Sequence, residues 1–173
     1  MDEKEFSKLV AEKLRNLIGG YQVKTGDSVV YKLIVDGSGK IKPPNIRYPA
    51  RGQYAFETDI LIQNEKVPLI IVEVKLDSFT THDVLTYSTK AKKHKEVYPF
   101  LRYGFLIGNR DRIDGRFFTH NTDLDFALAM PDFESGVIQL ADIVREQLQV
   151  AERLISILDG STVSRFETRL HFD

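Results

Sequence analysis

The hydrophobic positions of this chain recur with two periods, which predict alternating helices and strands. Apolar residues three and four apart across residues 3–18, followed by a Gly-Gly pair, predict an N-terminal helix. Residues 80–98, "TTHDVLTYSTKAKKHKEVY", begin with a threonine N-cap and an acid in the first turn and end with lysines, the polarity that a helix dipole favours. Residues 135–160 predict a long amphipathic helix, around 136–159, closed by Gly160.

Runs of β-branched and aromatic residues predict the strands. We expect strands in residues 28–35, 54–62, 67–76 and 100–109, and one or two more within 115–130. The short polar link "QNEK" favours a hairpin between 54–62 and 67–76. Residues 40–53, with three prolines and a glycine, predict a long loop. The order is helix, strands, helix, strands, helix, and we expect one domain over residues 1–173.

Length and composition narrow the class of protein. A chain of 173 residues that is 42% hydrophobic and 28% charged is typical of one globular domain with a proper core. There is no run of eighteen apolar residues, and the first ten residues, "MDEKEFSKLV", are acidic and amphipathic, unlike a signal peptide. We therefore expect a cytoplasmic protein with no membrane partner.

The residue types also limit the metal chemistry. With no cysteine, disulfides and cysteine-based zinc or iron–sulfur sites are excluded, and the four histidines show no ligand spacing. Oxygen-ligand metals remain. The net charge is only −1, but eight Lys/Arg stand against three Asp/Glu between Lys90 and Arg116. That window either faces phosphates or is a solvated helix face and loop.

The predicted strand 67–76, "VPLIIVEVKL", places charge at the end of an apolar run. Glu73 and Lys75 share a face with Leu69 and Ile71, because alternate strand residues point the same way. A carboxylate in such surroundings costs several kcal/mol unless it is paired, solvated or metal-bound. An ion pair between Glu73 and Lys75 is the simplest solution.

The preceding strand repeats this arrangement. Glu57, Asp59 and Leu61 share one face of "FETDILI". If the two strands form a hairpin, Asp59 and Glu73 converge near one end with Lys75 beside them. Two carboxylates and one ammonium leave a negative charge, which a hard divalent cation would neutralise.

This spacing resembles the PD-(D/E)XK nuclease superfamily, in which an acid ends one strand and an acid-x-lysine lies on the next. Here the residues are Asp59 and then Glu73-Val74-Lys75, with Thr58 in place of the namesake proline. The order of elements over residues 1–120 is similar to the nuclease domain of type I restriction enzymes and stand-alone relatives. The resemblance implies an α/β restriction-endonuclease-like core, with a central mixed four- to five-stranded sheet flanked by helices.

The resemblance also implies a mechanism. Asp59, Glu73 and the backbone carbonyl of Val74 would bind Mg²⁺, for which Mn²⁺ would substitute, and Lys75 would orient water or stabilise charge. A further acid would come from Glu5 or Glu12 of the first helix, or from Glu57. The glutamine and tyrosine often found four apart on the following helix correspond here to Asp83 and Tyr87.

The function implied is a metal-dependent DNA endonuclease of restriction or host-defence type. Cleavage of both strands by a stand-alone enzyme favours a homodimer, with the long C-terminal helix as its interface. One alternative is a non-catalytic nuclease-fold module that binds nucleic acid or serves in a larger restriction complex. Another is junction or repair cleavage. The expected phosphate contacts are Arg47, Arg51, Lys90, Lys92 and Lys93.

Overall fold

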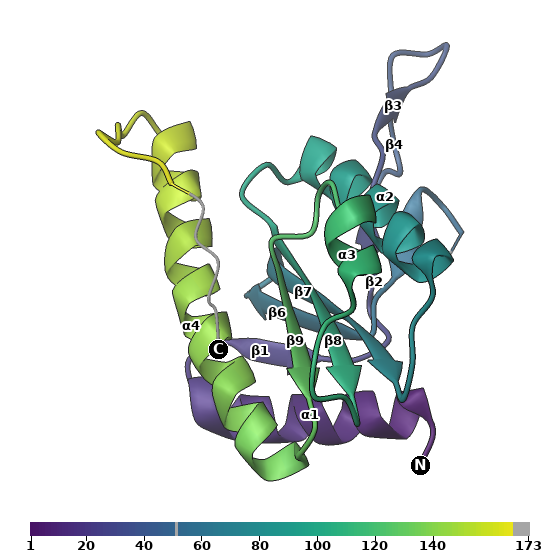
Figure 1. Ribbon diagram of the computed structural model, residues 1–173. Helices are drawn as coiled ribbons and strands as arrows, with labels where there is room; N and C mark the ends of the chain where they lie inside the picture. Colours follow the sequence, from purple (N-terminus) through teal and green to yellow (C-terminus); the bar gives the residue numbers. More distant parts are fainter. Residues whose placement is uncertain (51, 168–173) are drawn as a thin grey trace.

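A five-stranded mixed sheet forms the centre of the protein, and helices cover both of its faces (Figure 1). The computed structural model describes residues 1–50 and 52–167. The sheet strands, in spatial order, are β1 (Gln22–Lys24), β6 (Ile60–Asn64), β7 (Val67–Leu76), β8 (Arg102–Gly108) and β9 (Phe126–Met130). β1, β6 and β7 pair antiparallel, whereas β7, β8 and β9 pair parallel. The expected α/β architecture with a mixed sheet is confirmed.

Two helices pack on each face of this sheet. The helices are α1 (Glu3–Ile18), α2 (Thr81–Val97), α3 (Gly115–His120) and α4 (Phe133–Leu158). One core joins α1 and α4 to the face of β7 that carries Ile70, Val72 and Val74. The other core joins α2 and α3 to the opposite face, where Ile71 and Phe105 lie. A strand apolar on both faces is covered on both, as the composition of β7 requires.

The sequence signals for helix ends are borne out at α1, α2 and α4. α1 begins at a capping box formed by Asp2 and Glu5, and α2 begins at a second one formed by Thr80 and Asp83. α4 starts at Phe133, slightly before the expected boundary, because Asp132 caps it by accepting from the backbone of Ser135.

Two predicted strands are each divided in the structure. Residues 28–35 form β2 (Ser28–Val30) and β3 (Ile34–Val35), and residues 54–62 form β5 (Ala55–Glu57) and β6. β2 pairs with β5, whereas β6 pairs with β1 and β7. The break before β6 falls at Thr58, whose N–H and hydroxyl both donate to the carbonyl of Asp27. The chain thereby leaves the small sheet and enters the central one.

Three further segments differ from the sequence-based expectation. Residues 115–130 contain α3 and β9, although only strands were expected, and β1 was not predicted at all. The expected loop 40–53 contains the short strand β4 (Ile41–Lys42), which pairs with β3 in an arm that projects from the body (Figure 1). β1, β3 and β4 have only two or three residues each, too few to show a period.

None of the helices in the described residues combines the length and the apolar character that a membrane span requires.

Candidate active site

Asp59 lies where β6 begins and is held against the end of β7. The last antiparallel pair is Ile60 with Val72, so no β6 residue continues the ladder beyond it. Instead, the backbone N–H of Val74 donates to Asp59 Oδ2 at 2.8 Å. The side chain of Asp59 thus takes the place of a strand partner, which fixes the carboxylate at the carboxyl end of β7.

Glu73 is the most buried acid of this region, with 1% of its surface exposed. The hydroxyl of Tyr103, on β8, donates to its Oε1 at 2.6 Å, and the amine of Lys90, on α2, lies 3.1 Å from the same oxygen. Burial raises the pKa of Glu73 to about 7. The charge of Lys90 opposes this rise, and the charge of nearby Asp59 adds to it.

Lys75 pairs with an acid in the first turn of each of two helices, and not with Glu73. Its amine lies 3.3 Å from Glu3 Oε2, in the first turn of α1, and 3.6 Å from Asp83 Oδ1, in the first turn of α2. Burial alone would lower the pKa of Lys75, but the charge and hydrogen bond of Glu3, with the charges of Asp83 and Asp59, raise it above its usual value. Lys75 is therefore a stable ammonium at neutral pH.

The two strands bring the three predicted residues to one face and one end of the sheet. Leu61 pairs with Ile71, and both pack in the core beneath α2. Asp59 and Glu73 are the next residues on that face, by alternation along each strand. Leu69 is an exception to the expected alternation: a register shift leaves it without a partner, and it packs on the opposite face.

The oxygen atoms of Asp59, Glu73 and Val74 could supply some of the ligands that a hard cation needs. In an antiparallel ladder a residue directs its N–H and C=O toward the same neighbour, so the carbonyl of Val74 points toward the edge where Asp59 lies. No described residue donates to Oε2 of Glu73 or Oδ1 of Asp59. Mg²⁺ typically takes one or two carboxylates and completes its shell with water and phosphate oxygens. The described residues contain no cluster of three or more Asp, Glu or His side chains arranged to hold a metal.

The additional acids expected from the sequence lie elsewhere. Glu5 accepts from the backbone of Asp2 in the capping box of α1. Glu12 is exposed and lines a shallow surface hollow together with Glu5 and Leu9. Glu57 is exposed on β5, with its Oε1 near Gly26. The acid that α1 contributes beside Lys75 is instead Glu3.

The predicted phosphate contacts occupy different places. Lys90 is the ion-pair partner of Glu73, whereas the amine of Lys93 lies over the ring of Tyr31, 5.3 Å from its centroid. Lys92 is exposed on α2, and Arg47 lines a hollow at the far end of the β6–β7 hairpin. Arg51 lies outside the described residues. Of the described members of this group, only Lys90 is brought to the carboxylates.

Sequence reasoning missed Glu3, Tyr103 and the pairing of Lys90. The signal for Tyr103 was a phenol inside the apolar run of β8, where a buried hydroxyl needs a hydrogen-bond partner. The signal for Asp83 was the Thr-x-x-Asp capping box, which places this acid at the helix start. Nothing local to Glu3 indicates Lys75, because the two residues are far apart in sequence.

None of the histidines in the described part of the chain bonds to Asp59, Glu73 or Lys75. His94 is fully buried, and its Nε2 lies 3.1 Å from the carbonyl of Val29. Burial lowers the pKa of His94 to about 4, so the ring is neutral at pH 7. His82 is exposed, the Nδ1 of His120 lies near the carbonyl of Arg116, and His171 falls outside the described residues. Tyr87 packs in the core beneath α2.

Comparison with known proteins gives no family assignment. No protein-family model matches the sequence, and no curated protein matches it.

Proposed function

We propose that this protein is a metal-dependent DNA endonuclease of restriction or host-defence type, built on a restriction-endonuclease-like core. One observation carries the proposal: Asp59 and Glu73 lie at one end of adjacent antiparallel strands, on one sheet face, with the ammonium of Lys75 beside them. This is the arrangement that the resemblance to PD-(D/E)XK nucleases implies.

In this proposal the protein supplies ligands and a fixed charge. Asp59, Glu73 and the carbonyl of Val74 would hold Mg²⁺, or Mn²⁺ in its place. When bound, the cation would polarise the scissile phosphate and supply hydroxide from a coordinated water. Lys75, kept protonated by Glu3 and Asp83, would stabilise the negative charge that develops on the phosphate.

The pair Lys90 and Tyr103 would prepare Glu73 for this task. Both donate to the same oxygen, so the orientation of the carboxylate is fixed before a cation arrives. Because the pKa of Glu73 is about 7, cation binding there would displace a proton in part of the population. Lys90 would thus act on the carboxylate and not, as the sequence suggested, on a substrate phosphate.

A second candidate function is a non-catalytic nuclease-fold module, acting alone or within a larger restriction complex. The observation that favours it is that Glu73 and Lys75 already have charged or hydrogen-bonding partners within the protein. Glu73 already has Lys90 and Tyr103, and Lys75 already has Glu3 and Asp83. A protein that only binds nucleic acid would keep such pairs for stability and would not need the cation.

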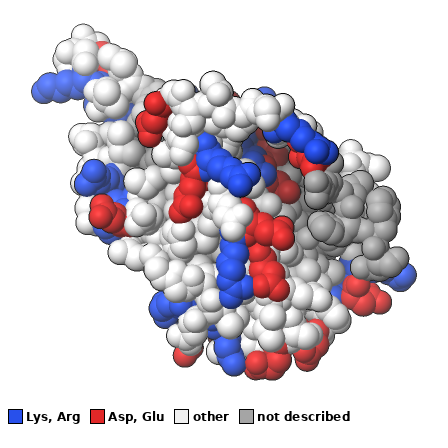
Figure 2. Space-filling view, turned by 90° about the vertical axis from the view of Figure 1, so that its left-hand side faces the viewer, with Lys and Arg blue, Asp and Glu red and all other residues white. Residues whose placement is uncertain are grey.

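The charge distribution limits where the DNA would bind. Basic and acidic side chains are interspersed on the face that carries α4, with no extended area of one sign (Figure 2). A polyanion needs a basic surface. The DNA would therefore approach the other side, where Lys90 of α2 pairs with Glu73 and where Lys92 and Lys93 lie on the same helix.

A homodimer through α4 remains part of the proposal. Ile138, Val150 and Leu158 of α4 are exposed, with 55%, 37% and 59% of their surfaces accessible. Sedimentation at micromolar concentration tests the dimer, and a monomer there would contradict it.

The central experiment is plasmid cleavage with Mg²⁺ or Mn²⁺, and with EDTA as a blank. The variants are Asp59→Asn and Lys75→Met, which should cut at least about a hundredfold more slowly than the wild type. Asp132→Asn is the matched control, because it makes the same change at an acid that only caps α4, a task that asparagine performs well. Equal cutting by all four proteins would reject the assignment of the site.

A further inference from the structure

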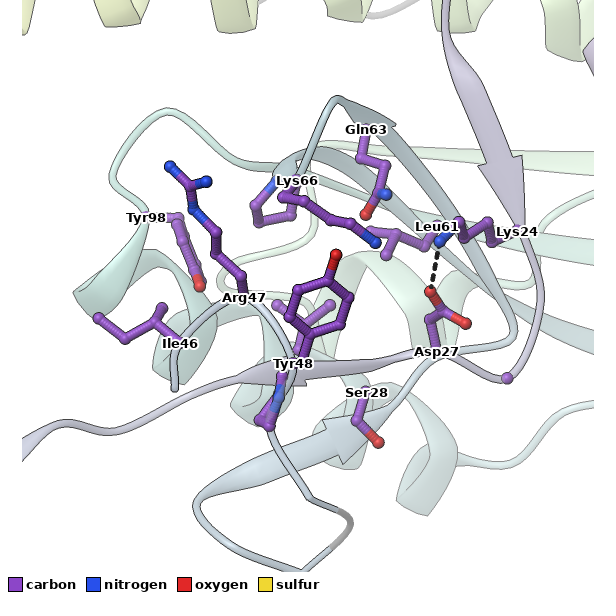
Figure 3. Close-up of a pocket in the computed structure, with 14 residues that line it drawn as sticks. Lys24, Asp27, Ser28, Ile46, Arg47, Tyr48, Leu61, Gln63, Lys66 and Tyr98 are labelled. Carbon is purple, nitrogen blue, oxygen red and sulfur yellow. Dashed lines mark ion pairs between the residues drawn. The ribbon is translucent and has the colours of Figure 1, made fainter. Parts of the chain in front are cut away.

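A second charged hollow lies at the opposite end of the β6–β7 hairpin from Glu73. It has a volume of about 400 Å³, and its walls carry Lys24, Arg47 and Lys66 against a single acid, Asp27. Tyr48 and Tyr98 line it as well (Figure 3). Such a combination of cations and aromatic rings is typical of sites that hold nucleotides.

The side chains of this hollow converge from four segments of the chain, residues 24–29, 46–49 and 61–68 and Tyr98. Lys24 and Lys66 reach toward each other from opposite walls, above Leu61 (Figure 3). The amine of Lys66 lies 4.2 Å from the centroid of the Tyr48 ring, and that of Lys24 lies 3.3 Å from Asp27 Oδ2. Leu61 gives the floor an apolar surface on which a base or sugar can rest.

The hollow and the candidate active site are on the same side of the sheet. Leu61 belongs to the core beneath α2, as does Ile71, the residue two before Glu73 on the same face. Gln63, which also lines the hollow, is four residues beyond Asp59, or about 13 Å along an extended chain at 3.3 Å per residue. Measured along the axis of a DNA duplex, where one strand has a phosphate about every 3.4 Å, that length corresponds to about four phosphates.

The wall of the hollow is also bonded to the segment that carries Asp59. The N–H of Thr58 donates to the carbonyl of Asp27 at 3.0 Å, and the N–H of Gly26 donates to the carbonyl of Thr58 at 3.0 Å. A ligand held between Lys24 and Lys66 would therefore be placed in a fixed relation to the carboxylate at position 59.

We propose that this hollow anchors a nucleotide of the nucleic-acid strand, with its phosphate between Lys24 and Lys66 and its ring against Tyr48. The proposal rests on the proposed function and deepens it, because it names a second contact with the substrate about four phosphates from the cleaved bond. A free nucleotide presents the same chemistry. The distance that matches several phosphates favours a continuous strand.

The test measures binding without cleavage, in buffer with EDTA. Fluorescence anisotropy of a labelled single strand of about 16 nucleotides gives the dissociation constant for wild type, Lys66→Gln and Tyr48→Ala. Lys13→Gln is the matched control, because it removes the same charge from α1 on the opposite face of the sheet. Titration with AMP, alone and in competition with the strand, separates the two sources of the ligand.

We expect Lys66→Gln and Tyr48→Ala to weaken strand binding about fivefold each, and Lys13→Gln to leave it unchanged. Lys66→Gln should also reduce the slope of log affinity against log salt by about one. Equal affinity for Lys66→Gln and Lys13→Gln would overturn the proposal. The proposal would also be overturned if AMP bound tightly while neither Lys66→Gln nor Tyr48→Ala changed the affinity for the strand. Because no cleavage is measured, failure of the nuclease proposal would be seen separately, in the plasmid assay.

Discussion

The amine of Lys75 lies 3.3 Å from Glu3, 72 residues earlier in the chain, and among the described residues it pairs with Glu3 and Asp83 and not with Glu73 on its own strand. The start of α1 is thereby fastened to the end of β7. The simplest expectation from sequence, an ion pair between Glu73 and Lys75, is replaced by separate pairs. Glu73 pairs with Lys90 of α2, whereas Lys75 pairs with Glu3 of α1 and with Asp83 of α2.

Replacing Glu3 should change the titration of Lys75. Glu3→Gln removes the largest influence that raises the pKa of Lys75, so that pKa should fall. If Lys75 acts as an ammonium, the alkaline limb of the cleavage pH profile should move to lower pH. Glu12→Gln, which removes the same charge from an exposed position of α1, is the control. An unchanged alkaline limb would show that Lys75 does not set it.

Glu73→Gln should make the metal-free protein more stable at alkaline pH. The folded pKa of Glu73, about 7, lies above its ordinary value of 4.5. The favourable contribution is therefore complete below about pH 4.5 and is lost as pH rises through 7, a difference of about 3 kcal/mol. Urea unfolding in EDTA at about pH 8 should show a gain of that order for the variant. A loss of stability would mean that the ion pair with Lys90 outweighs burial.

His94 should produce the opposite pH dependence. Its folded pKa of about 4 lies below its ordinary value of 6.5, because burial disfavours the charged ring. Its contribution is present above about pH 6.5 and is lost as pH falls through 4, again by about 3 kcal/mol. In EDTA, Glu73→Gln should therefore lose stability on acidification more steeply than wild type, whereas His94→Gln should gain it. Parallel curves for the two variants would contradict both assignments.

Mg²⁺ should raise the melting temperature through Glu73. The cation must displace the proton held by a carboxyl of pKa about 7, so the rise should be larger at about pH 8 than at about pH 6. Asp132→Asn should respond as wild type does, and Glu73→Gln and Asp59→Asn should not respond. A rise of equal size in Glu73→Gln would place the cation elsewhere.

Two glycine substitutions in helices should have opposite effects. Alanine normally stabilises a helix relative to glycine by up to about 1 kcal/mol. At Gly136, in α4, a Cβ would lie 2.2 Å from Cγ of the buried Met130, so Gly136→Ala should cost about 1–3 kcal/mol. At Gly115, at the start of α3, nothing lies within 4 Å, so Gly115→Ala should be neutral or stabilising. Thermal unfolding of the two variants measures the difference.

The elements predicted correctly are those with long periodic patterns and clear end signals. α1 and α2 begin at capping boxes, and α4 is long enough for its apolar stripe to be unmistakable. The hairpin of β6 and β7 was also predicted, because two apolar runs stand on either side of a short polar link. The prediction of a strand at α3 was wrong because Phe117 and Phe118 lie there, and aromatic residues are enriched in strands.

The sequence predicted only those residues of the site whose positions follow from the alternation of side chains along a strand. Asp59, Glu73 and Lys75 share a face because neighbouring strands of a hairpin keep a fixed register. Glu3, Tyr103 and Lys90 reach this site from α1, β8 and α2, and their contacts depend on how those elements pack. No local pattern encodes such a relation. The hollow beside Lys24 and Lys66 likewise exists only after distant segments meet.

The sequence by itself therefore determined the helices, the central hairpin and the face on which its acids lie, since these follow from spacing along one or two adjacent segments. Only the tertiary structure decided which cation accompanies which carboxylate. The reason is physical: the pairing of a buried charge depends on the low-dielectric surroundings that the other elements create, and those surroundings form only when the chain is packed.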